Sequence, residues 1–142
     1  MKKTKLLVEH SYDFDLLGLI TPVRDYKLAW IINKRMGINL EKEDDLEMEF
    51  LNAPILKISQ YFLSLPYGYV QLLKNKSLTS AAQISYLIPE LRNVDFFLII
   101  QDETTELNAD LFLEHLSREV HIQNVIKLNV NKIKSRENLL TY

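Results

Sequence analysis

The hydrophobic and polar positions of the chain follow two periods, and the change from one to the other divides the chain into elements. Alternation of the strand type, or a short continuous apolar run, predicts strands in six segments. These segments cover residues 14–20, 46–50, 55–65, 69–73, 94–100 and 125–130. Residues 52–54 interrupt the chain after the second segment, and Pro66, Tyr67 and Gly68 form a turn signal after the third. The second to fourth segments therefore predict a meander.

Two further segments have the helical period. The first spans residues 22–36, with Thr21 as the predicted N-cap, Pro22 at the first helical position and Gly37 as the stop. Its predicted core side carries Tyr26, Ala29, Trp30, Ile32 and Met36. Its other side gathers four cations around Ile31, here called the basic face: Arg24, Lys27, Lys34 and Arg35. A second helix is predicted over residues 108–119.

In chain order the elements are β-α-β-β-β-β-α-β. That order predicts an α+β fold: a largely antiparallel sheet of about six strands with two main helices on one face, as a ferredoxin-like variant with an extra hairpin. With 142 residues and no repeat or low-complexity linker, residues 1–142 are expected to form a single globular domain. For residues 132–142 the sequence leaves open a short helix or a tail.

The strand over residues 94–100 is apolar on both of its alternating sets, except at Asp95. Such a strand is central in a sheet and covered on both faces, or it packs at an oligomer interface. The two predicted helices are too few to cover the apolar surface on both faces of the sheet. A homodimer that buries the remaining apolar surface of this strand is therefore expected.

The most distinctive segment, residues 88–96, reads Ile-Pro-Glu, three residues, then Val-Asp and an aromatic residue, Phe96. It resembles the signature of the IPExxxVDY family, a family of uncharacterised bacterial proteins, mostly from Bacteroidetes, to which no activity is assigned. Residues 26–33, Tyr-Lys-Leu-Ala-Trp-Ile-Ile-Asn, resemble the helix motif of that family. The resemblance implies a bacterial, cytoplasmic setting but no mechanism. Phe96 keeps the ring of the family's tyrosine without its hydroxyl, which counts against that hydroxyl as an obligatory acid or hydrogen-bond donor.

Composition narrows the function classes. The formal net charge of −2 is too small to attract a polyanion by bulk charge, so nucleic acid is not expected as a partner. The chain has no cysteine, which excludes disulfides and thiolate chemistry and fits a reducing compartment, so a cytoplasmic location is expected. The apolar stretch after the basic residues 1–5 is only three residues long, so a signal peptide is not expected. No uninterrupted apolar run approaches the roughly 20 residues that a bilayer needs, so a membrane span is not expected either.

The motifs of the common enzyme classes are missing from the sequence. Gly18, Gly37 and Gly68 are isolated, so there is no glycine-rich phosphate loop. His115 and His121 are six residues apart, so they do not share a helix face as a metal-binding pair would. The sequence predicts no catalytic residue, no cofactor and no metal site.

Glu90 and Asp95 are the acids that invite a chemical hypothesis, because two carboxylates held close in a dry cleft can act as a general acid and a general base. The alternative is structural: Asn93 supports a turn, and Asp95 at the start of the strand accepts hydrogen bonds from the N–H groups of that turn. Arg92 is close enough in sequence to neutralise either acid. We prefer the structural account and keep Glu90, Arg92 and Asp95 as candidate ligand or partner contacts.

Three other polar features have simple explanations. Residues 41–49 include six acids, and they predict a solvated turn leading into an edge strand, because the glycine and ligand ladder of a calcium loop is missing. The basic face is predicted to be a solvated helix surface, without aromatic side chains on which nucleobases could stack. Lys132, Lys134 and Arg136 would add to it if the C-terminal segment lies nearby. Asn33 falls on the predicted core side, where it either ties the helix to a loop or contacts a ligand.

The leading functional hypothesis is a non-enzymatic cytoplasmic protein-interaction module, with a second copy or another protein as its partner. It rests on the aromatic residues around one predicted hairpin, Tyr61, Phe62, Tyr67 and Tyr69. Aromatic side chains are enriched at protein interfaces, but they also fill protein cores. The alternative is a small-ligand sensor resembling regulatory ferredoxin-like domains that bind amino acids between subunits. A hydrolytic or acid-base enzyme using Glu90 and Asp95 comes third. A hollow lined by Asp95 and Arg92 would favour the sensor, and a flat apolar patch would favour the interaction module.

Overall fold

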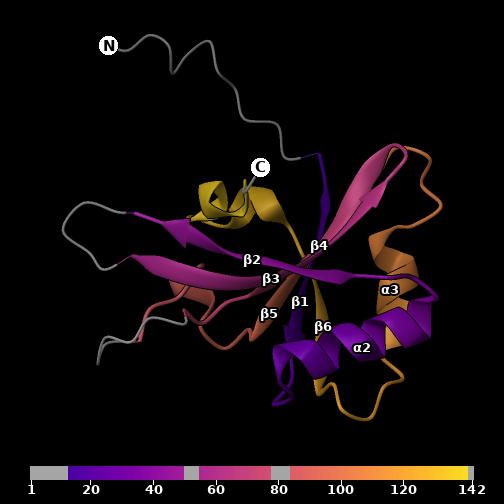
Figure 1. The fold of residues 1–142 in the computed structure, drawn as a ribbon, viewed down its shortest axis with the longest axis horizontal. Helices are drawn as coiled ribbons and strands as arrows, with labels where there is room; N and C mark the ends of the chain where they lie inside the picture. Colours follow the sequence, from indigo (N-terminus) through magenta and orange to yellow (C-terminus); the bar gives the residue numbers. More distant parts are fainter. Residues whose placement is uncertain (1–12, 50–54, 78–83, 141–142) are drawn as a thin grey trace, which may run out of the picture.

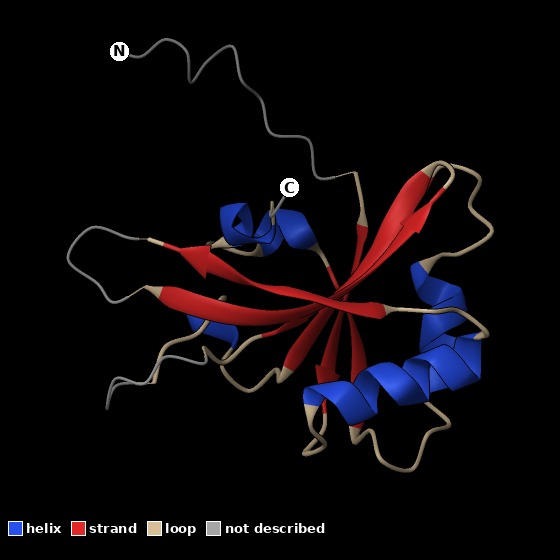
Figure 2. Ribbon diagram, viewed as in Figure 1, coloured by secondary structure: helices blue, strands red, loops and turns tan. Residues whose placement is uncertain are grey.

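The computed structural model describes residues 13–49, 55–77 and 84–140. Its strands form one antiparallel sheet in the order β2-β3-β4-β5-β1-β6 (Figure 1). Two α-helices and several short 3₁₀ turns accompany the sheet (Figure 2). The elements in chain order are β1 (Asp15–Ile20), α2 (Asp25–Met36), β2 (Glu41–Met48), β3 (Leu56–Leu65), β4 (Gly68–Lys74), η1 (Pro89–Leu91), β5 (Phe96–Asp102), α3 (Ala109–Leu116), β6 (Asn124–Leu128), η2 (Val130–Lys132) and η3 (Arg136–Leu139).

The predicted α+β class is confirmed: the sheet has six strands, all paired antiparallel, and the described residues contain two α-helices. Strands β2 to β5 form a continuous meander, while β1 lies between β5 and β6. The connections from β1 to β2 and from β5 to β6 each carry one helix. The ferredoxin-like assignment within this class stays a prediction.

Both faces of the central strand β5 are covered by elements of the chain itself. Phe96, Leu98 and Ile100 belong to one hydrophobic cluster, together with the buried side chains of α2 and α3. Phe97 and Ile99 belong to a second cluster, together with buried residues around η1, η2 and η3. The central position predicted for this strand is confirmed, and so is the placement of both helices on one face. The apolar surplus that led the sequence to predict a dimer is buried within the described fold.

The C-terminal segment packs on the sheet face opposite α2 (Figure 1). It forms the two 3₁₀ turns η2 and η3, and Val130, Ile133 and Leu139 are buried in the second cluster. For residues 132–140 the open choice between a short helix and a tail is decided in favour of short, packed helical turns, and residues 141–142 lie outside the described residues. The cations of this segment, Lys132, Lys134 and Arg136, consequently lie across the sheet from α2 and do not extend the basic face.

Helix α2 begins at Asp25, three residues later than predicted. Arg24 is its N-cap and makes no side-chain capping bond. The predicted cap, Thr21, uses its hydroxyl elsewhere: it donates to the carbonyl oxygen of His121 at 2.6 Å and accepts from the N–H of Val23 at 3.3 Å. The predicted end is confirmed, because Gly37 adopts the left-handed conformation with φ 66° and donates its N–H to the carbonyl of Asn33.

The predicted core side of α2 is wrong for its two aromatic residues. Tyr26 is 63% exposed and Trp30 is 59% exposed. The buried residues of α2 are Leu28, Ala29, Ile31 and Ile32. Both sets satisfy helical spacing, but the aliphatic set forms a continuous stripe at i, i+1, i+3 and i+4 that fits closely on the sheet. Ile31, which the sequence placed among the cations of the basic face, therefore lies in the core.

The acidic segment forms the edge strand itself rather than a turn before it. Strand β2 pairs only with β3 in the sheet, and residues 41–45 are exposed. The predicted turn is wrong because β3 is long enough to pair with the acidic residues, with Glu41 opposite Phe62. The register shifts between Glu43 and Leu46. A charged, irregular edge of this kind resists pairing with a further strand.

The β3–β4 hairpin confirms the turn signal at residues 66–68, because Leu65 pairs with Gly68 across the turn. Glycine is required at this position, since a Cβ on Gly68 would collide with the carbonyl oxygen of Gln101 on β5. Phe50 and the predicted break at residues 52–54 lie outside the described residues.

A buried amide joins the end of β4 to the segment before β5. The polar composition of residues 74–83 predicts a loop, but Asn75 is fully buried. Its Nδ2 donates to the carbonyls of Leu91 and Val94, both at 2.9 Å, and its Oδ1 accepts from the N–H of Ile88 at 2.8 Å. Its backbone also bonds Asp95 and Leu87. One side chain therefore satisfies three backbone groups of residues 88–94.

We expect Asn75→Ala to lower the free energy of unfolding by about 3 kcal/mol or more, because it leaves buried backbone donors and acceptors without partners. Equilibrium urea denaturation measures the change. The matched control is Asn131→Ala, an exposed amide that should change stability by less than about 0.5 kcal/mol. Equal losses in the two variants would show that the Asn75 amide does not hold this segment.

Candidate functional site

The Ile-Pro-Glu segment forms the 3₁₀ turn η1, with Ile88 as its N-cap, and the acid of this turn bonds the C-terminal segment. Glu90 accepts from the N–H of Ser135 at 2.6 Å and from the Ser135 hydroxyl at 2.8 Å. Burial alone would raise the pKa of Glu90, but the hydrogen bonds from Ser135 and from nearby backbone outweigh it and hold the pKa below its ordinary value. Glu90 thus ties η1 to the C-terminal segment.

Asp95 serves a different backbone group from the one predicted. Its Oδ2 accepts from the N–H of Thr21 at 2.9 Å, and its own N–H donates to the carbonyl of Leu19. Asp95 therefore accepts a backbone hydrogen bond, as predicted. The donor is not in the turn at Asn93, however, because Thr21 follows the end of β1. Glu90 and Asp95 have separate partners, so these contacts do not support a shared acid and base.

Asp95 lines a hollow of about 420 Å³ at the N-terminal end of α2. We call it the cationic hollow, after the charged and aromatic side chains in its wall: Arg24, Lys74, Lys76, Tyr86, Arg92 and Asp95. The structure therefore brings together three of the predicted site residues, Arg24, Arg92 and Asp95. The other predicted residues do not line this hollow.

The cations of this hollow come from three parts of the chain. Strand β4 pairs with β5 so that Lys74 lies opposite Phe96, and Lys76 forms an isolated bridge with Tyr86. Arg24 enters from the start of α2, whose N-terminal end adds a partial positive charge. Within residues 13–49, 55–77 and 84–140, none of the four cations forms an ion pair. Lys74 and Lys76 could not be found from the sequence, because only strand pairing places them beside this hollow.

Asn33 makes the contacts of a structural residue. Its Nδ2 donates to the carbonyl of Leu40 at 3.1 Å, and its Oδ1 accepts from the N–H of Leu40 at 2.8 Å. The amide therefore ties α2 to the chain before β2, as one of the two sequence interpretations proposed. Contact between Asn33 and a ligand stays a prediction without support from these hydrogen bonds.

The remaining cations of the basic face line a second hollow of about 600 Å³. We call it the α2–α3 hollow, because α2 forms one wall and the end of α3 with its following connection forms the other. Its polar and aromatic wall includes Lys27, Trp30, Lys34, Arg35, Glu119 and His121. His115 lines it as well. The basic face is thus divided between two hollows, and an exposed tryptophan accompanies its larger part, contrary to the prediction that no aromatic platform is present.

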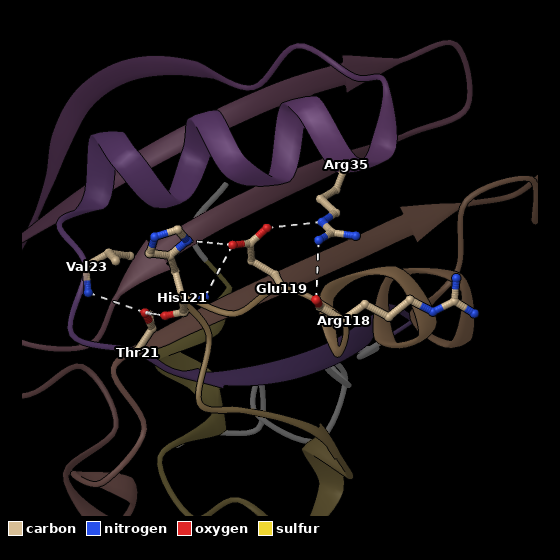
Figure 3. Close-up of polar contacts among 6 residues, drawn as sticks. All are labelled: Thr21, Val23, Arg35, Arg118, Glu119 and His121. Carbon is tan, nitrogen blue, oxygen red and sulfur yellow. Dashed lines mark hydrogen bonds and ion pairs between the residues drawn. The ribbon is translucent and has the colours of Figure 1, made fainter.

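A charged network links the walls of this hollow (Figure 3). Arg35 Nε lies 3.1 Å from Glu119 Oε1, and Glu119 Oε2 lies 2.6 Å from His121 Nδ1. Arg35 also donates to the carbonyl of Arg118 at 3.3 Å. The hydrogen bond with His121, followed by the contacts with Arg35, lowers the pKa of Glu119 to about 2. The sequence analysis considered His121 only as a possible metal ligand and missed this pairing, although Glu119 stands only two residues away.

No group of three or more potential metal ligands occurs within the part of the chain that the structure describes. Across the same residues, no helix has the length and apolar character needed to cross a membrane. No family model, curated protein or solved structure matches the chain.

The Glu119 network predicts a pH-dependent contribution to stability. The pKa of Glu119 is about 2 in the folded protein against an ordinary 4.5, so the stabilisation is complete above about pH 5 and is lost as the pH falls through 4.5 toward 2. Glu119→Gln should therefore lower the free energy of unfolding at pH 7 by about 1–2 kcal/mol, because solvent screens a partly exposed network. Urea denaturation from pH 7 to pH 2 measures this.

The difference between the wild type and Glu119→Gln should shrink toward zero at the acidic end of that range. Glu103→Gln, which neutralises an exposed carboxylate, is the matched control and should show no such pH-dependent difference. A destabilisation of Glu119→Gln that is constant from pH 7 to pH 2 would contradict the assignment.

Proposed function

We propose that the protein is a non-enzymatic binding module and that its ligand is a small anion held in the cationic hollow. The observation that carries the proposal is the gathering of Arg24, Lys74, Lys76 and Arg92 around one hollow without an ion pair among the described residues. Like charges repel one another, so such an arrangement lowers stability until an anion neutralises it. Core packing gives no reason for this arrangement.

The wall of the hollow indicates a phosphate or carboxylate group on the ligand. Arginine presents a planar fork that matches both groups, and lysine supplies point charges. Asp95 keeps acceptor capacity beyond its bond to Thr21, which suits a ligand hydroxyl. The volume of about 420 Å³ lies within the range of small-molecule sites. A small phosphorylated or multiply carboxylated metabolite fits these features best.

The aromatic residues of the β3–β4 hairpin give little support to the protein-interaction hypothesis, which stays a prediction. Of the four rings at the hairpin, Tyr69 is buried and stacks on Phe62 with ring centroids 5.6 Å apart, and Tyr61 packs against the core. Tyr67 is the exposed one, at 63%. The hairpin therefore uses most of its aromatic surface internally, and strand β5 does not need a second copy to cover it.

Membership of the IPExxxVDY family, a bacterial cytoplasmic setting and homodimer formation also remain proposals. The family resemblance rests on residues 26–33 and 88–96, and the second of these segments contributes Arg92 and Asp95 to the hollow. A cytoplasmic binding module for a small anionic metabolite is consistent with this resemblance and with the absence of cysteine.

We expect the wild-type protein to bind at least one of three probe anions, pyrophosphate, inorganic phosphate or citrate, in isothermal titration calorimetry at low salt. The double variant Lys74→Gln/Arg92→Gln should weaken that binding at least about tenfold, because it removes two charge-assisted contacts. The control is Lys132→Gln/Lys134→Gln, which makes the same change of charge on the opposite side of the sheet. Absence of binding for all three anions, or an equal loss in the control, would contradict the proposal.

A further inference from the structure

The α2–α3 hollow combines an exposed indole ring with a group of cations. The ring is the indole of Trp30, which is 59% exposed although tryptophan has a large apolar surface to bury. The cations beside it are Lys27, Lys34 and Arg35. A wall with both a planar ring and positive charge suits a ligand that has an aromatic ring at one end and an anionic group at the other.

The exposed indole can accept a stacked ring. Lys34 Nζ lies 5.0 Å from the centroid of the Trp30 ring, so the ammonium takes one face of the indole. Stacking needs only one face, so a base would use the face of the indole that Lys34 does not occupy. Trp30 is neither held in the core nor used in a ring–ring contact of the described residues, so its role in folding is small.

The donors of the hollow keep N–H groups that can bind a phosphate. Lys27 makes no ion pair within the described ranges. Arg35 uses its Nε and one Nη for Glu119 and Arg118, and further N–H groups of its guanidinium remain. Because Glu119 holds the Nδ1 of His121, the Nε2 of that ring is the nitrogen left for a ligand.

The acid in the wall does not oppose an anionic ligand strongly. Glu119 is the one carboxylate that lines this hollow in the described structure, and it is paired with both Arg35 and His121 (Figure 3). Its negative charge is therefore balanced locally, while Lys27 and Lys34 remain in excess. The wall offers no serine, threonine or cysteine as a nucleophile, which favours binding over covalent chemistry.

We propose that the α2–α3 hollow binds a free nucleotide, with the base stacked on Trp30 and the phosphate held by Lys27 and the neighbouring cations. The hollow of about 600 Å³ is in the range of small-molecule sites. This site is separate from the cationic hollow, since the two share no lining residue. The nucleotide site therefore stands or fails independently of the function proposed above.

The sequence supplies a direct probe, because Trp30 is the single tryptophan of the chain. Titration with adenosine monophosphate should quench the intrinsic tryptophan fluorescence to saturation. Adenosine, which lacks the phosphate, and ribose 5-phosphate, which lacks the base, should each bind at least about tenfold more weakly. Equal affinity for ribose 5-phosphate and adenosine monophosphate would overturn the proposal, because the hollow would then be an anion site without stacking.

Variants test the two halves of the site with matched controls. Lys27→Gln should weaken adenosine monophosphate binding about tenfold, while Lys57→Gln, an exposed lysine on β3, should leave it unchanged. Trp30→Ala should weaken adenosine monophosphate binding at least as much as Lys27→Gln does. Because this variant lacks the fluorophore, its binding is measured by calorimetry. Tyr67→Ala removes an equally exposed ring at the β3–β4 turn and should have no effect.

Three further results would reject the nucleotide site. The first is the absence of both quenching and heat on titration with adenosine monophosphate. The second is a single-stranded oligonucleotide that binds far more tightly than the mononucleotide, since the site would then belong to a polymer. The third is loss of nucleotide binding in Lys74→Gln/Arg92→Gln with retention in Lys27→Gln, since the nucleotide would then occupy the cationic hollow.

Discussion

The buried amide of Asn75 is the interaction on which the arrangement of the cationic hollow depends. Asn75 directly follows Lys74 at the end of β4, and its side chain binds three backbone groups of residues 88–94. That contact holds Arg92 and the start of β5 against the end of β4. Cations that are distant in sequence therefore face one hollow because of a neutral, fully buried interaction. The mutual repulsion of the four cations opposes this arrangement, so the neutral contact is needed to hold it.

The near-neutral charge of the chain conceals a separation between acids and bases. Several acids accept hydrogen bonds from the chain itself: Glu90 from Ser135, Asp95 from Thr21 and Glu119 from His121. Others occupy the exposed edge strand β2, where they oppose pairing with further strands. The cations around α2 are left with fewer partners. A net charge of −2 thus permits two locally positive hollows, which composition alone does not show.

Period and turn signals predicted the fold class because they are local properties of the sequence. The meander from β2 to β4, the central position of β5 and the end of α2 at Gly37 agree with that analysis. The buried side of α2 could not be fixed in the same way, because two stripes with helical spacing compete and only contact with the sheet selects one. The partner of Asp95 was missed for a related reason: Thr21 lies 74 positions away in sequence and becomes a neighbour through strand pairing.

Stability and binding are assigned to different residues in this fold. Asn75, Asn33 and Glu90 satisfy backbone groups, so their substitution should affect folding. Trp30 and Arg92 are exposed and satisfy no backbone group of the described residues, so folding does not account for them. Exposed aromatic and cationic side chains that line hollows without serving the core are best explained by binding. This separation means that the two hollows can be altered one at a time in a chain that still folds.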